Sequence, residues 1–167
     1  MGNAASDKRL LIVWHSRTGA SEAMAFEAAH AAQDEIRVDL LRADDTTVED
    51  VLAAAAFLFV CPENLGTMSG SMKEFFDRSY YPVLGRIEGR PYGTIIAAGS
   101  DGTGAERQLD RIVTGWRLNR VIDPLIVNFD AQDAVSILAP KRVSNEIVEK
   151  CREIGATLGA GAAMGVF

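Results

Sequence analysis

The chain has 167 residues, which is the length of one ordinary domain. Its 17 Lys and Arg residues are outnumbered by 23 Asp and Glu residues, and the net charge of −6 argues against a nucleic-acid partner, which needs a basic face. The longest uncharged stretch, residues 154–167, is too short to span a bilayer, so we expect no membrane partner. The two cysteines, Cys61 and Cys151, form no paired motif, and we expect reduced thiols and a cytoplasmic location.

Apolar segments alternate with helical segments after a polar leader, residues 1–7, which we expect to be disordered. The expected strands cover residues 9–15, 36–41, 57–61, 93–98 and 121–129. The expected helices cover residues 19–33, 48–55, 71–80, 105–118 and 144–164. Pro62 is expected to end the third strand, and Pro82 to break the third helix. This alternation predicts parallel strands with helices on both faces, in a single doubly wound α/β domain spanning residues 8–167.

The loop after the first strand has the composition of a phosphate cradle. It consists of Ser16, Arg17, Thr18, Gly19, Ala20 and Ser21. Backbone N–H groups at the start of the following helix lack intrahelical partners and attract an anion, while the hydroxyl groups add donors. The loop lacks the lysine of a nucleotide-triphosphate loop and the repeated glycines of a dinucleotide loop, so a single phosphate monoester suits it best. The alternative is an N-capped helix without a ligand.

This loop resembles the S/T-x-T-G-x-S/T loop that binds the FMN phosphate in flavodoxins and related flavin reductases. The resemblance implies a flavodoxin-like three-layer sandwich with a five-stranded parallel sheet of order 2-1-3-4-5, and FMN at its switch point. In such a sheet the ligand lies beyond the carboxyl ends of the strands, where three loops rich in small and hydroxyl residues gather.

The loop after the third strand resembles the segment P-x-x-x-G-x-x-x-G-x-x-K-x-x-x-D-R/W of NAD(P)H-dependent FMN reductases and of tryptophan-repressor-binding-protein-like quinone reductases. The resemblance implies that its backbone borders the isoalloxazine ring. The implied ring-binding residues are Pro62, Glu63, Asn64, Leu65, Gly66, Thr67 and Met68. Beyond them, Phe75 and Phe76 are expected to be core or interface contacts, and Lys73 and Asp77 to form an i,i+4 pair.

The loop after the fourth strand resembles the loop that closes over the other edge of the flavin. Its implied cofactor-binding residues are Gly99, Ser100, Asp101 and Gly102. Asp101 has two interpretations, a loop or cap residue beside Gly102, or a hydrogen-bonding partner of the ring or ribityl chain.

Neither of these two loops contains Trp, Tyr or Phe, whereas classical flavodoxins commonly enclose the ring between aromatic side chains from the same loops. An unshielded ring face favours a two-electron reductase over a one-electron carrier. Trp14, Tyr80, Tyr81, Trp116 or a neighbouring subunit can still supply an aromatic group, although packing roles suit Trp14 and Trp116 better. A phosphoacceptor receiver domain needs an acidic pair after the first strand, which Val13-Trp14-His15 does not offer.

The sequence therefore predicts an FMN-binding, NAD(P)H-dependent oxidoreductase that passes electrons to a quinone, flavin or similar small acceptor, with a flavodoxin-type electron carrier as the alternative. FMN carries the chemistry and NAD(P)H is the co-substrate, so no side chain is assigned as an acid or base and no metal is expected. The glycines of the last helix, including Gly155 and Gly159, predict close packing within the domain, or a homodimer or tetramer interface.

Overall fold

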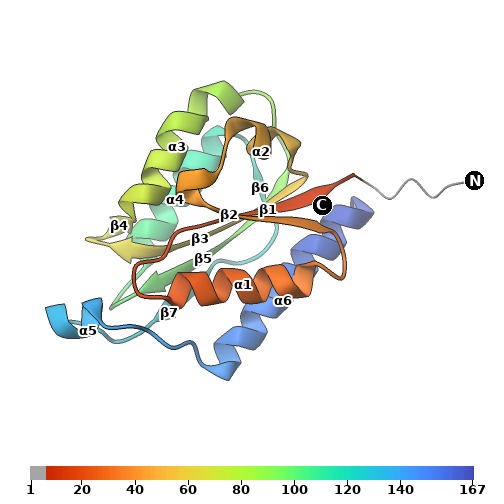
Figure 1. Cartoon of the computed structure of the whole chain (residues 1–167). Coiled ribbons are helices and arrows are strands. Elements are labelled where there is room, and N and C mark those ends of the chain that lie inside the picture. Colours follow the sequence, from red (N-terminus) through yellow and green to blue (C-terminus); the bar gives the residue numbers. More distant parts are fainter. Residues whose placement is uncertain (1–6) are drawn as a thin grey trace, which may run out of the picture.

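The computed structural model describes residues 7–167, in which a parallel sheet lies between two layers of helices (Figure 1). The expected leader lies, apart from Asp7, outside the described residues. The strands are β1 Arg9–Trp14, β2 Arg37–Arg42, β3 Ala56–Asn64, β4 Thr67–Met68, β5 Pro91–Ala98, β6 Asn119–Arg120 and β7 Leu125–Asn128. The helices are α1 Ala20–Ala32, the 3₁₀ helix η1 Ala43–Asp45, α2 Val48–Ala53, α3 Gly70–Val83, α4 Thr103–Gly115, α5 Ala134–Leu138 and α6 Asn145–Met164.

The sheet has the predicted order. Its strands follow one another as β2-β1-β3-β5-β6, and β7 also pairs with β5. β6 pairs with the start of β5 and β7 with its end, so the two short strands together occupy the fifth position. All pairings along this path are parallel, and the order of the strands confirms the expected order 2-1-3-4-5. β4 lies off this path and forms an antiparallel hairpin with β3.

Both faces of the sheet are buried, as the continuous apolar strands predict. In β1, Leu10 and Ile12 pack into one core cluster and Leu11 and Val13 into the other, all without solvent exposure. α1 and α6 cover one face, and α2, α3 and α4 cover the other (Figure 1). α6 lies so close to α1 that a Cβ added at Gly155 would stand 2.0 Å from the Ala28 carbonyl oxygen, which gives its glycine a packing role inside the domain.

Three expected boundaries were wrong. β3 continues through Pro62 to Asn64: Pro62 still pairs with Ala97 of β5, while on the other side β1 has already ended beside Val60, so no β1 residue stands opposite position 62 to accept an amide. α3 continues to Val83 with Pro82 one residue before its end, so the proline removes an amide from the last turn and does not shorten the helix by more than that turn. Of the strand expected at residues 121–129, only β7, residues 125–128, is present; it begins after Pro124, which cannot donate to a ladder, and the two-residue β6 lies before the expected range.

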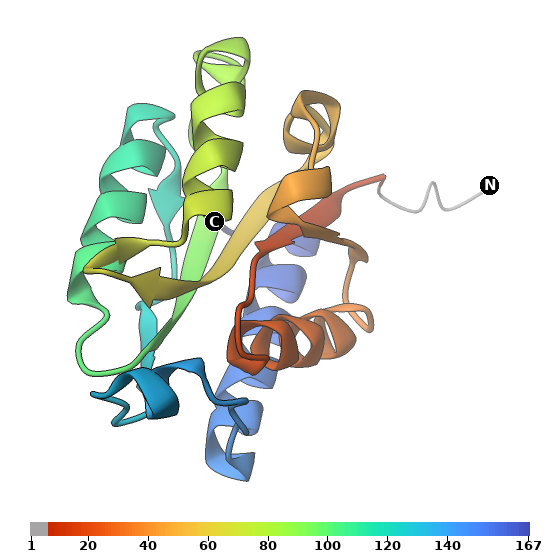
Figure 2. The same cartoon turned by 60° about the vertical axis from the view of Figure 1, so that its left-hand side comes forward.

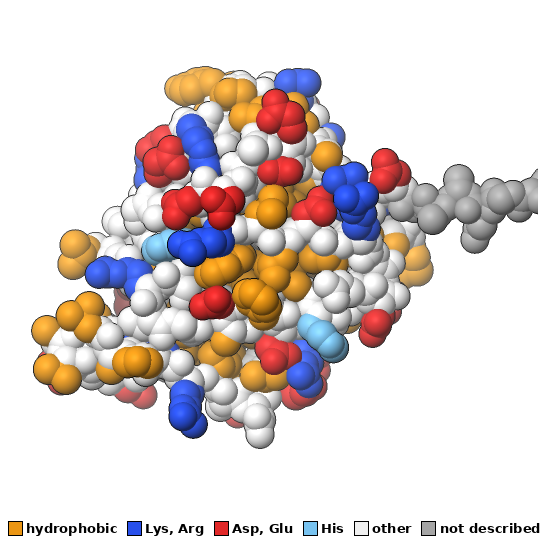
Figure 3. Space-filling model, in the orientation of Figure 1, with side chains coloured by type: hydrophobic (Ala, Val, Ile, Leu, Met, Phe, Trp, Pro, Cys, Tyr) orange, Lys and Arg blue, Asp and Glu red, His pale blue; other side chains and the backbone are white. Residues whose placement is uncertain are grey.

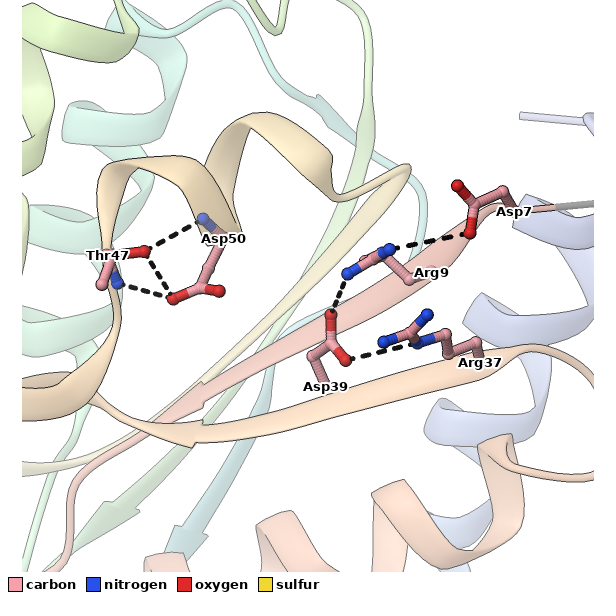
Figure 4. Close-up of polar contacts among 6 residues, drawn as sticks. All are labelled: Asp7, Arg9, Arg37, Asp39, Thr47 and Asp50. Atoms are coloured by element: carbon pink, nitrogen blue, oxygen red, sulfur yellow. Dashed lines mark hydrogen bonds and ion pairs between the residues drawn. The ribbon is translucent and has the colours of Figure 1, made fainter.

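Local polar contacts fix the first half of the fold. Figure 4 shows Arg9 of β1 reaching Asp39 of β2, with 3.1 Å between Nη1 and Oδ2, which links the two strands at their pairing edge. In the same view Thr47 and Asp50 form a capping box at the start of α2. Within residues 7–167, no helix is long and apolar enough to cross a membrane.

Candidate cofactor site

A cavity opens at the carboxyl ends of β1, β3 and β5, the edge at which a sheet of this order binds its ligand. All three predicted loops contribute to its wall, so the structure brings them together. The lining residues are Arg17, Thr18, Ala20, Pro62, Glu63, Asn64, Ala97, Ala98, Gly99, Phe129, Ala131, Ile137, Leu138 and Lys141.

The first loop has the geometry of an anion cradle. Gly19 takes φ 97°, a left-handed conformation that turns the chain directly into α1, and Ser16 Oγ accepts the Gly19 amide at 3.0 Å. No side chain caps α1, and among the described residues no acceptor contacts the amides of Ala20 and Ser21. Ser21 is 1% exposed, yet its Oγ has no hydrogen-bond partner within residues 7–167. An unpartnered buried hydroxyl beside free helix amides fits a phosphate ligand.

The second loop is a β-hairpin, which the sequence did not predict. Its turn holds Leu65 at φ 52° and Gly66 at φ 76°, and Leu65 is fully exposed at the tip. Thr67 Oγ1 donates to the Asn64 carbonyl across the turn, and Met68 is buried. Of the seven residues predicted to border a ring, only Pro62, Glu63 and Asn64 line the cavity.

Glu63 connects the second loop to the third. Its Oε1 accepts the Gly102 amide at 2.9 Å, and its Oε2 accepts the Ala105 amide at 3.1 Å. The carboxylate therefore caps the N-terminus of α4, where negative charge is favourable. Both of its oxygens are engaged within the protein, which makes Glu63 a residue that positions the site.

In the third loop, Gly99 lines the cavity and Ser100, Asp101 and Gly102 do not. Asp101 Oδ1 accepts hydrogen bonds from the Thr103 amide and hydroxyl, which is the cap interpretation of this residue. A Cβ at Gly102 would lie 2.5 Å from Ile126 Cγ2, so this glycine allows β7 to approach.

His15 sits between the first loop and α3. Its Nδ1 lies 2.8 Å from Ser69 Oγ, which links the end of β1 to the residue before α3. Burial, with the charges of Arg42 and Arg17, holds the pKa of His15 below its usual value, against the opposing effect of Asp44. Cys61 is fully buried in β3, and burial raises the pKa of its thiol to about 12, which confirms that it packs as a small hydrophobe.

The aromatic residues considered from the sequence do not line the cavity. Trp14 is 8% exposed at the strand end, and Trp116 is fully buried and stacks on Tyr80. Tyr81 is exposed. The aromatic residue that does line it is Phe129, at the end of β7, which sequence reasoning missed.

Sequence reasoning also missed the segment that follows Phe129, residues 130–144, which we call the strap. It contributes Ala131, Ile137, Leu138 and Lys141 to the cavity wall and contains α5. A signal was present, because Asp133 and Ser136 form a capping box before an apolar run.

A parallel sheet of this order, with an anion cradle after its first strand and a cavity at its switch point, defines a flavodoxin-like flavoprotein domain. Residues 45–132 match the sequence model of the NADPH-dependent FMN reductase family. A flavodoxin from Aquifex aeolicus (strain VF5) is 30% identical over 163 residues, covering 93% of this chain and 88% of its own. The chain therefore belongs to the NADPH-dependent FMN reductase family, among the flavodoxin-like, FMN-binding proteins.

Solved structures agree on the fold. A flavodoxin from the domain Archaea superposes with a TM-score of 0.72 at 13% identity, covering 92% of this chain and 98% of its own. The flavodoxin, WrbA-like protein from Agrobacterium tumefaciens gives a TM-score of 0.68 at 18% identity, covering 94% and 98%.

The residues present fit FMN. The free amides of α1, the unpartnered Ser21 hydroxyl and Thr18 at the cavity wall would hold the phosphate. Arg17 also lines the cavity, close to the same loop, and no hydrogen bond occupies its guanidinium within the described residues. Lys141 cannot serve in the same way, because its Nζ already donates to the carbonyls of Ser136, Ile137 and Ala139.

Proposed function

We propose that this protein is an FMN-dependent NAD(P)H oxidoreductase that delivers electrons to a small quinone, flavin or similar acceptor, in the cytoplasm. When bound, FMN supplies the capacity to accept two electrons and pass them on. With a quinone acceptor, NAD(P)H, one proton and the quinone become NAD(P)⁺ and the hydroquinone, so atoms and electrons balance.

The chain's own residues bind and orient in this proposal. Thr18, Ser21 and the α1 amides hold the phosphate, while Pro62, Ala97 and Ala98 form a low wall of small side chains beside the ring. Glu63 fixes the second loop against the third. No side chain is assigned as an acid or base: among the lining residues, Glu63 is engaged by two amides and Lys141 by three carbonyls, and Arg17 keeps its proton at neutral pH. The cavity thus suits direct transfer between two stacked rings.

The observation that favours a reductase over other functions is the set of side chains that line the cavity. The second loop presents Pro62, Glu63 and Asn64 to the cavity, and the end of β5 with the third loop presents Ala97, Ala98 and Gly99, none of them aromatic; the aromatic residue among the lining residues is Phe129, at the end of β7. A nicotinamide must stack with its reacting atom roughly 3–3.5 Å from the ring, and small side chains leave that approach open where an aromatic cover would block it. The matched reductase family model supports the same function.

A flavodoxin-type carrier is the second candidate. It is favoured by the relative from Aquifex aeolicus, which is called a flavodoxin, and by the net charge of −6, which suits docking to basic redox partners.

Anaerobic mixing of the FMN-loaded protein with NADPH, and separately with NADH, distinguishes the two. We expect the visible flavin absorption to bleach completely with at least one nucleotide, and to return through repeated turnovers when a quinone is added. Free FMN at the same concentration controls for the uncatalysed reaction. If neither nucleotide bleaches the flavin faster than this control, while dithionite does so fully, the carrier assignment replaces the reductase.

A further inference from the structure

The strap carries exposed apolar side chains in an ordered helical turn. None of the five residues of α5 is buried, and Val135, Ile137 and Leu138 are 83%, 47% and 62% exposed. The turn is nevertheless held at both ends. Asp133 and Ser136 form its capping box, and Lys141 Nζ donates to three carbonyls near its C-terminus. The turn thus keeps apolar side chains in a fixed position facing solvent, which is costly unless something covers them.

Two anchors hold the strap across the cavity. On one side the Ala131 amide donates to the Gly99 carbonyl at 2.8 Å, so the strap is attached to the third loop. On the other side the Lys141 amide donates to the Thr18 carbonyl at 2.8 Å, attaching it to the phosphate loop. In Figures 1 and 2, α5 accordingly lies at the same end of the molecule as the β3–β4 hairpin and the start of α1. The strap therefore spans the two loops between which a cofactor would lie.

The three large apolar side chains of α5 differ in whether they line the cavity. Ile137 and Leu138 line the cavity, whereas Val135 on the same turn does not. Figure 3 shows hydrophobic side chains gathered where α5 projects, at one end of the face in view. Ile137 and Leu138 share this cavity with the apolar side chains of Phe129, Pro62 and Ala97.

We propose that Ile137 and Leu138 form an aliphatic wall that packs against the planar ring of the bound flavin. This inference rests on the cofactor assignment above, and on the fact that the two side chains line the same cavity as Thr18 and Ala20 of the phosphate loop. It assigns the strap a direct role in holding the ring, in addition to its backbone contacts with Thr18 and Gly99.

The test is equilibrium titration of FMN and of riboflavin, which has the same ring and no phosphate, followed by flavin fluorescence. The variants are the double substitution Ile137→Ala/Leu138→Ala and the control Val135→Ala, which removes a comparable side chain from the same turn but away from the cavity. Alanine favours helix at these exposed positions, so α5 is expected to persist. Should the double variant show a lowered thermal midpoint, the single variants Ile137→Ala and Leu138→Ala carry the test.

We expect the double variant to bind FMN and riboflavin about tenfold more weakly than wild type, from the apolar area lost at the ring. Val135→Ala should bind both as wild type does. If wild type binds FMN tightly and the double variant binds it equally well, the proposed contact of Ile137 and Leu138 with the ring is wrong and the cofactor assignment stands. Weakening of FMN alone would show that the strap acts on the phosphate through Thr18, which also overturns it. No FMN binding by wild type would refute the cofactor assignment itself, and the wall with it.

Discussion

Replacing Glu63 with Gln should weaken the hydrogen bonds that connect the second loop to the third. The carboxylate accepts two backbone amides at the start of α4, from Gly102 at 2.9 Å and Ala105 at 3.1 Å. A glutamine of the same size can accept one of them and presents a donor to the other. Losing one bond to a charged acceptor costs about 1.5 kcal/mol, and losing the negative charge at a helix N-terminus costs about 0.5 kcal/mol more. We therefore expect Glu63→Gln to lower the free energy of unfolding by about 2 kcal/mol.

The assay is urea denaturation of the cofactor-free protein, with a thermal scan beside it. About 2 kcal/mol corresponds to a fall in the melting temperature of roughly 4–8 °C for a domain of this size. Glu22→Gln is the matched control, because Glu22 is an exposed acidic residue in the first turn of α1 without a hydrogen bond in the described part of the chain. It should change stability by no more than about 0.5 kcal/mol. Equal midpoints for Glu63→Gln and Glu22→Gln would refute the structural role given to Glu63.

Three further predictions concern packing, thiols and pH. Gly155→Ala should destabilise the protein by about 3 kcal/mol in denaturant unfolding, because the added Cβ would meet a backbone oxygen of α1. Gly70→Ala is the control and should cost nothing, because open space surrounds its Cβ. Similar losses of stability in both variants would contradict the close packing of α6 on α1. Cys61 and Cys151 are buried and burial raises the pKa of each thiol to about 12, so a thiol reagent at pH 8 should label neither until the protein unfolds; prompt labelling of native protein would count against this. The pKa of His15 is lowered in the folded state, so the contribution of its neutral ring to stability is present above pH 6.5 and is lost as pH falls below 6.5. Between pH 7.5 and 5, wild type should therefore lose more free energy of unfolding than His15→Gln. Equal losses in the two proteins would exclude this contribution of His15.

The phosphate loop could be predicted from the sequence because every signal in it is local. The order of strand, hydroxyl-rich loop and alanine-rich helix lies within residues 9–32, and the left-handed turn falls on the one glycine of the loop, Gly19. The sheet order followed from the alternation of elements and the family resemblance, without knowledge of any side-chain contact.

The second loop could not be predicted in the same way, because distant contacts determine it. Pro62 is accommodated in β3 because β1 ends at Trp14 while β5 continues beside it, and Glu63 finds its partners about forty residues further along the chain. Leu65 adopts a left-handed conformation that leucine rarely takes, so a turn at this position has no propensity signal.

The strap and the divided fifth strand are different, since the sequence did contain their signals. Pro124 within an apolar run argues against a continuous strand, and Asp133 three residues before Ser136 predicts a helix start. The strap's place over the cavity, by contrast, depends on the amide contacts of Ala131 and Lys141, which join loops from distant parts of the chain.

The central claim is that the loop after β1 holds the phosphate of FMN. The most direct measurement is the dissociation constant of FMN for wild type and for Thr18→Ala/Ser21→Ala, with riboflavin titrated in parallel. Ser21 Oγ has no protein partner in the described chain, so its removal should not disturb the fold. Losing two hydrogen bonds to a charged phosphate should cost about 3 kcal/mol, which is roughly a hundredfold in FMN affinity, and should leave riboflavin binding unchanged. Equal FMN affinities for the two proteins, or an equal loss for FMN and riboflavin, would contradict the assignment.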